Sequence, residues 1–198
     1  MKFLIALLMA LAAITSFAET VIIDFQSLEH VDSNTNSHGF TYTEDGYTLN
    51  NLATAFPFAT FGTLESRYKG STALFNDSVN GVTRLTKSDA GAFTLNSIDL
   101  ADLNGQSPFD VFFSGTKSDA SIVNQTFTGT GSLLTYTFSG FTDLVTVEWT
   151  QISPFHQFDN INLTSGINGT SAVPVPAAIW LFGSAALGFL GLRRKNQV

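Results

Sequence analysis

Apolar and polar side chains alternate in many short stretches between residues 19 and 163. Val21, Ile23 and Phe25 alternate near the start of this region, and Val145, Val147 and Trp149 alternate near its end. Successive side chains of a β-strand point to opposite faces, so the pattern predicts strands with one buried face. Nineteen phenylalanines and 16 glycines favour strands joined by turns. No helical period is sustained over ten residues in this region.

About ten short strands follow one another at the spacing that is typical of a sandwich or barrel. The expected strands are Val21–Phe25, Tyr47–Leu52, Ser71–Phe75, Val82–Thr86, Phe93–Leu100, Phe109–Gly115, Ile122–Thr128, Leu134–Phe138, Val145–Trp149 and Phe158–Leu163. Apolar positions change parity at Asn96-Ser97, which predicts a β-bulge. Residues 34–63 carry little pattern and are expected to be rich in loops. We therefore predict an all-β protein with an antiparallel β-sandwich over residues 19–163.

The N-terminus has the features of a secretory signal peptide. Lys2 precedes a short apolar run, and Ser16-Phe17-Ala18 forms a small-x-small cleavage site. Signal peptidase is expected to remove residues 1–18 by cutting between Ala18 and Glu19. An uncleaved anchor is the alternative, but the apolar run of about 12 residues is short for a membrane span.

A second apolar run, Ala177–Leu192, contains no charge and ends at Arg193, Arg194 and Lys195. A helix over residues 177–192 would be roughly 24 Å long, slightly short of the ~30 Å hydrocarbon core. Basic residues stay on the cytoplasmic side, so the preceding chain is expected outside the cytoplasm. Residues 164–172 are rich in Gly, Ser, Thr and Asn and form the predicted linker to this single transmembrane helix.

The order of parts in the tail is specific: prolines, a short apolar helix and a basic end. The tail begins Val173-Pro174-Val175-Pro176-Ala177 and continues AIWLFGSAALG. It resembles the PEP-CTERM sorting signal of Gram-negative bacteria in its VPxPAA form, although Val175 stands where the commonest form has Glu. The resemblance implies recognition by an exosortase at the inner membrane, followed by release to the cell surface or an extracellular polysaccharide matrix such as that of a biofilm. A plain C-terminal envelope anchor is the alternative.

The region before the tail resembles jelly-roll sandwiches of the galactose-binding or carbohydrate-binding-module type. The segments that carry this weaker resemblance are Ile22–Phe25, Phe93–Asp102, Phe138–Trp149 and Phe158–Leu163. It implies a non-enzymatic glycan-binding or structural component of the extracellular matrix. The alternative from another class is a secreted glycan-acting hydrolase, since the 16 carboxylates allow a catalytic pair in principle.

Charge and cysteine content exclude several functions. All 16 acidic residues but only five of the nine basic residues lie between Glu19 and Ser171, which leaves a formal charge of −11. Phosphate binding needs a basic surface, so nucleic acid is not an expected partner. The chain has no cysteine, which excludes disulfides, thiolate metal sites and a cysteine nucleophile.

The resemblance to jelly-roll modules implies one candidate cofactor, a structural calcium ion between the first and last strands. Asp24 and Glu29 lie near the first strand, and Asp159 shares its parity with Ile161 and Leu163 in the last one. An inward carboxylate needs a partner, and calcium prefers oxygen ligands. The alternative is that Asp159 caps a turn through backbone N–H groups.

Exposed aromatic side chains are the usual means of stacking on a sugar ring. Tyr68 and Phe155 lie in polar or proline-marked segments and are the candidate glycan contacts. Core packing is the alternative for both. Trp149 keeps register with Val145 and Val147, so we expect it in the core.

Overall fold

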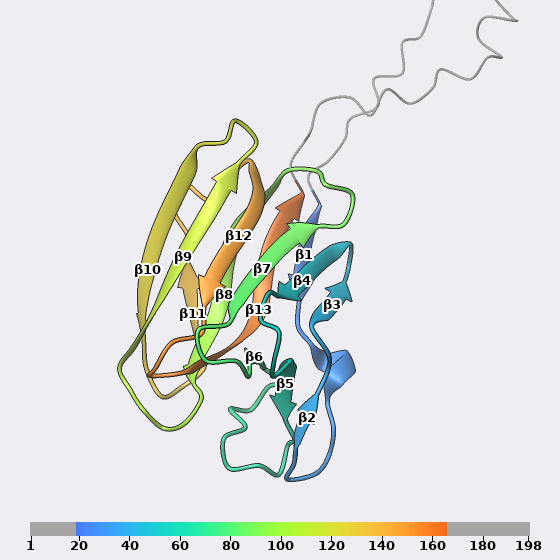
Figure 1. The fold of residues 1–198 in the computed structure, drawn as a ribbon, viewed down its shortest axis with the longest axis vertical. Coiled ribbons are helices and arrows are strands. Elements are labelled where there is room, and N and C mark those ends of the chain that lie inside the picture. Colours follow the sequence, from blue (N-terminus) through green and yellow to red (C-terminus); the bar gives the residue numbers. More distant parts are fainter. Residues whose placement is uncertain (1–18, 166–198) are drawn as a thin grey trace, which may run out of the picture. The chain divides into compact units, whose positions relative to one another are not determined.

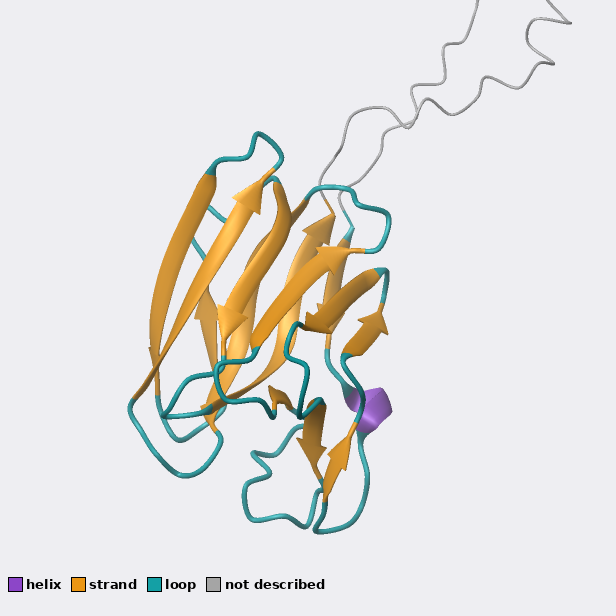
Figure 2. Ribbon diagram, in the orientation of Figure 1, coloured by secondary structure: helices purple, strands orange, loops and turns teal. Residues whose placement is uncertain are grey.

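The computed structural model describes residues 19–165, which form an all-β unit of 13 strands and one 3₁₀ turn, η1 (Gln26–Leu28) (Figures 1 and 2). The predicted signal peptide, most of the linker, the transmembrane helix and the sorting tail lie outside these residues. Within residues 19–165, no helix is long and apolar enough to cross a membrane.

The strands form two antiparallel layers (Figure 1). The first layer contains β1 (Thr20–Ile23), β13 (His156–Ser165), β8 (Phe93–Asp102) and β11 (Leu134–Thr137), extended beyond β13 by β6 (Leu74–Asn76), β5 (Phe58–Phe61) and β2 (Thr35–Ser37). The second contains β3 (Thr41–Glu44), β4 (Tyr47–Asn51), β7 (Val82–Lys87), β12 (Leu144–Thr150), β9 (Phe109–Lys117) and β10 (Ile122–Gly129). One bridging pair, Leu144 with Phe93, connects the layers.

Eight strands pair in the order of a jelly roll. They run β1–β13–β8–β11 in one layer and β7–β12–β9–β10 in the other. Successive strands from β7 to β13 therefore cross from one layer to the other, except at the β9–β10 hairpin, which lies within the second layer; this is the connectivity of paired Greek keys. The predicted all-β sandwich of jelly-roll type is confirmed.

Aromatic side chains fill the space between the layers. Trp149 contacts Phe113 and Phe158, with ring centroids 5.4 and 5.1 Å apart. Phe113 and Trp149 occupy directly paired positions of β9 and β12, and both side chains are buried between the layers. The expected burial of Trp149 is confirmed. Edge-to-face and tilted aromatic pairs of this kind add to the free energy gained by burial.

The expected strands are present, and the structure adds three in the region predicted to be loop-rich. These are β2, β3 and β5. β5 escaped prediction because all four of its residues are buried, so it shows no alternation. β1 ends at Ile23, and Phe25 adopts φ +54° ahead of η1, so it is not part of the first strand. β13 continues to Ser165, two residues beyond the predicted domain boundary.

The β8–β13 ladder contains the predicted irregularity. Leu163 pairs with Leu95 and Asn162 with Ser97, so Asn96 is an extra residue in β8. A second shift lies between Asn162 and Asp159, where Asn160 adopts φ +46°. This second shift changes the parity of β13, which places Phe158 in the core with Ile161 and Leu163. Asp159 is buried as expected, but the inference that it shares a face with those two residues was wrong.

We predict that Trp149→Ala lowers the free energy of unfolding by ~3–5 kcal/mol, because it removes a large buried ring between two packed layers. Trp149→Phe should cost less, since the indole N–H has no hydrogen-bond partner among the described residues. Chemical denaturation measures both. Phe112→Ala, at a position 53% exposed on β9, is the control and should change stability by less than about 0.5 kcal/mol. Wild-type stability of Trp149→Ala would contradict this assignment.

Candidate functional site

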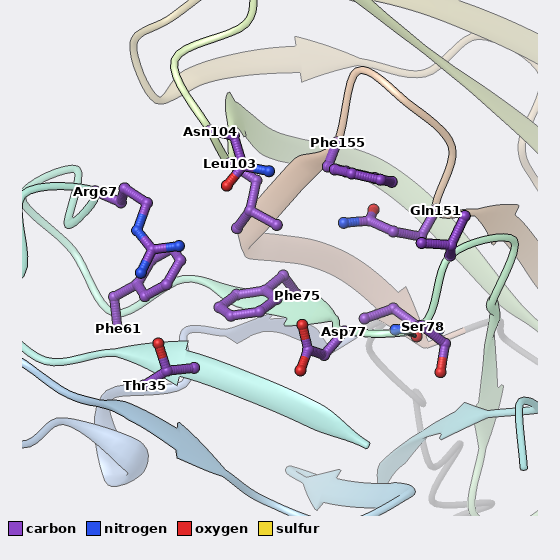
Figure 3. A pocket seen from close by; sticks show the side chains of 12 residues that line it. Thr35, Phe61, Arg67, Phe75, Asp77, Ser78, Leu103, Asn104, Gln151 and Phe155 are labelled. Carbon is purple, nitrogen blue, oxygen red and sulfur yellow. Dashed lines mark hydrogen bonds between the residues drawn. The ribbon is translucent and has the colours of Figure 1, made fainter. Parts of the chain in front are cut away.

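A cleft of about 420 Å³ opens at the end of the sandwich where β5 and β6 meet two loops (Figure 3). Phe61 and Phe75 from β5 and β6 form one side. Leu103 and Asn104, which follow β8, and Phe155, which precedes β13, form the opposite side. The remaining lining residues are Thr35, Arg67, Asn76, Asp77, Ser78, Val79 and Gln151.

The apolar floor of the cleft is a small cluster separate from the main core. It comprises Ala59, Phe61, Phe75 and Leu103, with Phe155 packed against it. β6 creates this cluster because it is buried on both faces: Leu74 enters the main core and Phe75 the small cluster. The rings of Phe61 and Phe75 lie 4.7 Å apart. Phe155 is the partly exposed member of this group.

Arg67 is fixed at one end of this floor. Its guanidinium carbon lies 4.1 Å from the centroid of the Phe61 ring, and its Nε donates to Glu65 at 3.0 Å. The Gln157 side chain donates to the Arg67 carbonyl oxygen at 3.2 Å and to that of Asp102 at 2.9 Å, which ties this segment to β8. The two Nη groups have no hydrogen-bond partner among the described residues, so they remain available as donors.

Acceptors and amides complete the rim. Burial raises the pKa of Asp77, an effect that the nearby Arg67 charge opposes. Gln151 donates through its Nε2 to the carbonyl of His156 at 2.9 Å, while its buried Oε1 accepts no hydrogen bond from described residues. Leaving such an acceptor unpaired costs about 1–3 kcal/mol. Asn104 is exposed. The cleft therefore presents donors and acceptors around an aromatic floor.

The turn between β6 and β7 is shaped by Asn76. Its Oδ1 accepts the backbone N–H of Ser78 at 3.0 Å, and its Nδ2 donates to Thr83 at 3.3 Å. Gly81 is required here because a Cβ would lie 2.5 Å from the Asn76 amide oxygen. This turn sets the position of Asp77 and Ser78 on the cleft wall.

Of the two predicted glycan contacts, the structure places Phe155 in the cleft. Tyr68 is partly buried and does not line it. Sequence reasoning missed Phe61 and Phe75, which the β5–β6 pairing brings together, and Arg67, whose guanidinium lies over the Phe61 ring. The available signal was weak: Arg67 is one of five basic residues in an acidic region, and it lies between β5 and β6, outside every predicted strand.

Asp159 lies in a second polar site, on the first layer. It pairs across the ladder with Asp99, and Asn160 donates from its backbone to Asp159 at 2.7 Å and from its side chain to Asp99 at 2.8 Å. Burial is the main cause that raises the pKa of Asp159 to about 7; hydrogen bonds from Ser71 and Asn160 oppose the rise, and the charges of Asp99 and Asp24 add to it. The site thus favours a protonated carboxyl group.

The structure brings Asp24 near Asp159 but leaves Glu29 exposed, with no contact to this site. Within residues 19–165, no group of three or more His, Cys, Asp or Glu side chains is arranged to hold a metal ion. The backbone N–H of Asn160 on Asp159 matches the turn-capping alternative. The calcium site over Asp24, Glu29 and Asp159 stays a prediction.

No protein-family model matches the chain, and no curated protein matches it either. Among solved structures it is similar to a family 29 carbohydrate-binding module, with 14% identity, a TM-score of 0.43, and 76% of this chain and 91% of that chain covered. A variant complexed with cellulohexaose has 13% identity and a TM-score of 0.43, over 75% and 92%. A variant complexed with mannohexaose has 13% identity and a TM-score of 0.36, over 76% and 94%. These TM-scores are too low to bear on the function of this chain.

The raised pKa of Asp159 predicts a pH-dependent contribution to stability. Between pH 4 and 7 the Asp159 carboxyl group keeps a proton in the folded protein that it has lost in the unfolded chain. Its contribution to the free energy of unfolding therefore falls as the pH rises, by at most about 1.4 kcal/mol per pH unit, and is gone above pH 7. His156, whose pKa burial lowers to about 3, acts in the opposite direction below pH 6.5. The difference in unfolding free energy between wild type and Asp159→Asn isolates Asp159, and it should shift in favour of the variant as pH rises.

A difference in unfolding free energy that does not change with pH would contradict a protonated Asp159 carboxyl group.

The calcium prediction is tested by thermal melting of the purified protein at pH 8, once with calcium and once with chelator. Bound calcium would raise the melting temperature of wild type but not of Asp159→Ala, while identical melts would rule it out.

Proposed function

We propose that this protein is an exported, non-enzymatic, glycan-binding component of the cell surface or extracellular polysaccharide matrix, and that the cleft between Phe75 and Phe155 binds the glycan. The observation that carries the proposal is the composition of the cleft. Sugar sites combine an apolar ring surface for the C–H face of a pyranose with donors and acceptors for its hydroxyls.

The residues around the floor suit a neutral sugar. Arg67 supplies donors, Asp77 supplies an acceptor, and the exposed side-chain amide of Asn104 can do both. The formal charge of −11 between Glu19 and Ser171 repels polyanionic chains. A neutral polysaccharide is therefore the expected ligand class.

The hydrolase alternative finds less support at this cleft. Most glycosidases use two carboxylates flanking the scissile bond. Asp77 is the one carboxylate among the residues that line the cleft. Glu148, on the outer face of β12, accepts from Arg84 at 2.6 Å and lies in none of the described cavities.

The proposal includes the route of export. Signal peptidase would cut after Ala18, and an exosortase would act on the tail that begins at Val173, after transient insertion of residues 177–192 in the inner membrane. The tail motif and its basic end support this route. A plain C-terminal anchor remains the competing proposal, and processing distinguishes them.

Binding is tested by affinity electrophoresis of the purified protein in gels containing glucan, mannan, xylan, galactan or alginate. We expect retardation by at least one neutral polysaccharide and none by alginate. Phe155→Ala and Asn104→Ala should weaken binding about tenfold, because each removes a contact at the centre or rim of the cleft.

Phe112→Ala is the matched control, since Phe112 lies on the outer face of β9 away from the cleft. Melting temperatures establish that each variant is folded. The proposed site would be overturned if none of the neutral polysaccharides retarded the wild-type protein. It would also be overturned if Phe112→Ala weakened binding as much as Phe155→Ala and Asn104→Ala do.

Sorting is tested by mass spectrometry of surface material from cells with a functional exosortase. Chains should begin at Glu19 and end between Val173 and Ala177. Replacing Pro174 and Pro176 by alanine should leave the protein in the inner membrane with its tail attached. Finding intact tails alone in wild-type cells would instead support the plain anchor.

A further inference from the structure

Phe56 is a large aromatic residue that is exposed to solvent beside the cleft. It lies in the loop between β4 and β5 and is 64% exposed. Leu52 and Val79, at 44% and 65% exposed, flank the same area. Exposed apolar residues that lie together mark interaction sites more often than single exposed residues do.

The backbone of Phe56 is in a conformation that a bulky residue seldom adopts. Its φ is +58°, and it precedes Pro57, which further restricts the preceding residue to extended conformations. Such a conformation persists only when the surroundings fix it, and it is enriched at ligand sites.

Two buried side chains fix this loop. The amide of Asn51 donates to the Phe56 carbonyl at 3.1 Å and accepts the backbone N–H of Ala53 at 3.0 Å. The hydroxyl of Ser78 donates to the same Phe56 carbonyl at 2.7 Å. Both residues are almost completely buried. The exposed ring is therefore attached to a fixed backbone.

The loop borders a hollow that continues from the cleft. This hollow, of about 640 Å³, is lined by residues 52–56 and by Asp77, Ser78 and Val79. The latter three residues also line the cleft. Ser78 connects the two depressions, because it lies in the wall of the cleft and its hydroxyl group donates to the loop that borders the hollow.

We propose that the hollow at Phe56 is a second sugar subsite, so that the protein binds several consecutive units of a neutral polysaccharide chain across the Asp77–Val79 ridge. The inference rests on the proposed function of the cleft. The Phe56 ring would stack on one sugar unit while Phe155 contacts another. Because the backbone of Phe56 is fixed, only its side-chain torsions must be ordered on binding, so the contact loses little entropy and contributes efficiently to affinity.

The test is the dependence of affinity on chain length. Oligosaccharides of two, four and six units, taken from whichever of glucan, mannan, xylan and galactan binds, are titrated calorimetrically against the purified protein. Wild type should gain affinity with length. Phe56→Gly should bind the shortest fragment normally but lose about tenfold in affinity for the longest.

Phe56→Gly is the informative variant because glycine adopts positive φ without strain, so the melting temperature should not fall. Phe56→Trp should retain the length dependence, and Phe112→Ala is the control for loss of an exposed ring. An unchanged length dependence in Phe56→Gly would overturn the subsite while leaving the cleft intact. Failure of wild type to bind any of the fragments would overturn the proposed function itself, and the subsite with it.

Discussion

The pairing of β13 with β8 is the interaction on which the rest of the structure depends. These are the two longest strands, and β13 also pairs with β1 and β6. Without β13, the first strand and the β6–β5–β2 extension would have no partner in the main sheet. Phe158 and Leu100 meet directly across the pair and enter the core, where Phe158 contacts Trp149 of the other layer. The last strand of the described residues therefore closes the sandwich.

The cleft is a consequence of the same pairing. Phe155 immediately precedes β13, Leu103 immediately follows β8, and the backbone N–H of Leu103 donates to the Phe155 carbonyl at 2.9 Å. Gln157 then ties the Arg67 segment to β8. The β5–β6 pairing brings Phe61 and Phe75 against these residues. The loops that form the cleft are thus attached to the most extensively paired strands, an arrangement in which a rigid scaffold holds the loops in position.

The sequence was sufficient to predict strands that bury one face, because their side chains alternate. This holds for Val147 and Trp149 in β12 and for the bulge at Asn96, whereas a register shift at the start of β12 places Leu144, and not Val145, in the core. The prediction failed for β5, where residues on both faces are buried, and for Asp159, where the conformation of Asn160 changes the parity of β13. Phe155 was predicted as a glycan contact from its proline-marked surroundings; it lines the cleft, and its contact with a glycan stays a prediction. Its partners Phe61 and Phe75 were not predicted, because a contact between a loop and a distant hairpin leaves no periodic signal.

The central claim is that the cleft between Phe75 and Phe155 binds a neutral glycan. The most direct measurement is chemical-shift mapping by NMR of the isotope-labelled protein with fragments of a polysaccharide that it binds. The account predicts that shifts concentrate at Phe75, Asp77, Asn104, Gln151 and Phe155. Shifts confined to the outer face of the second layer, around Phe112, would contradict it.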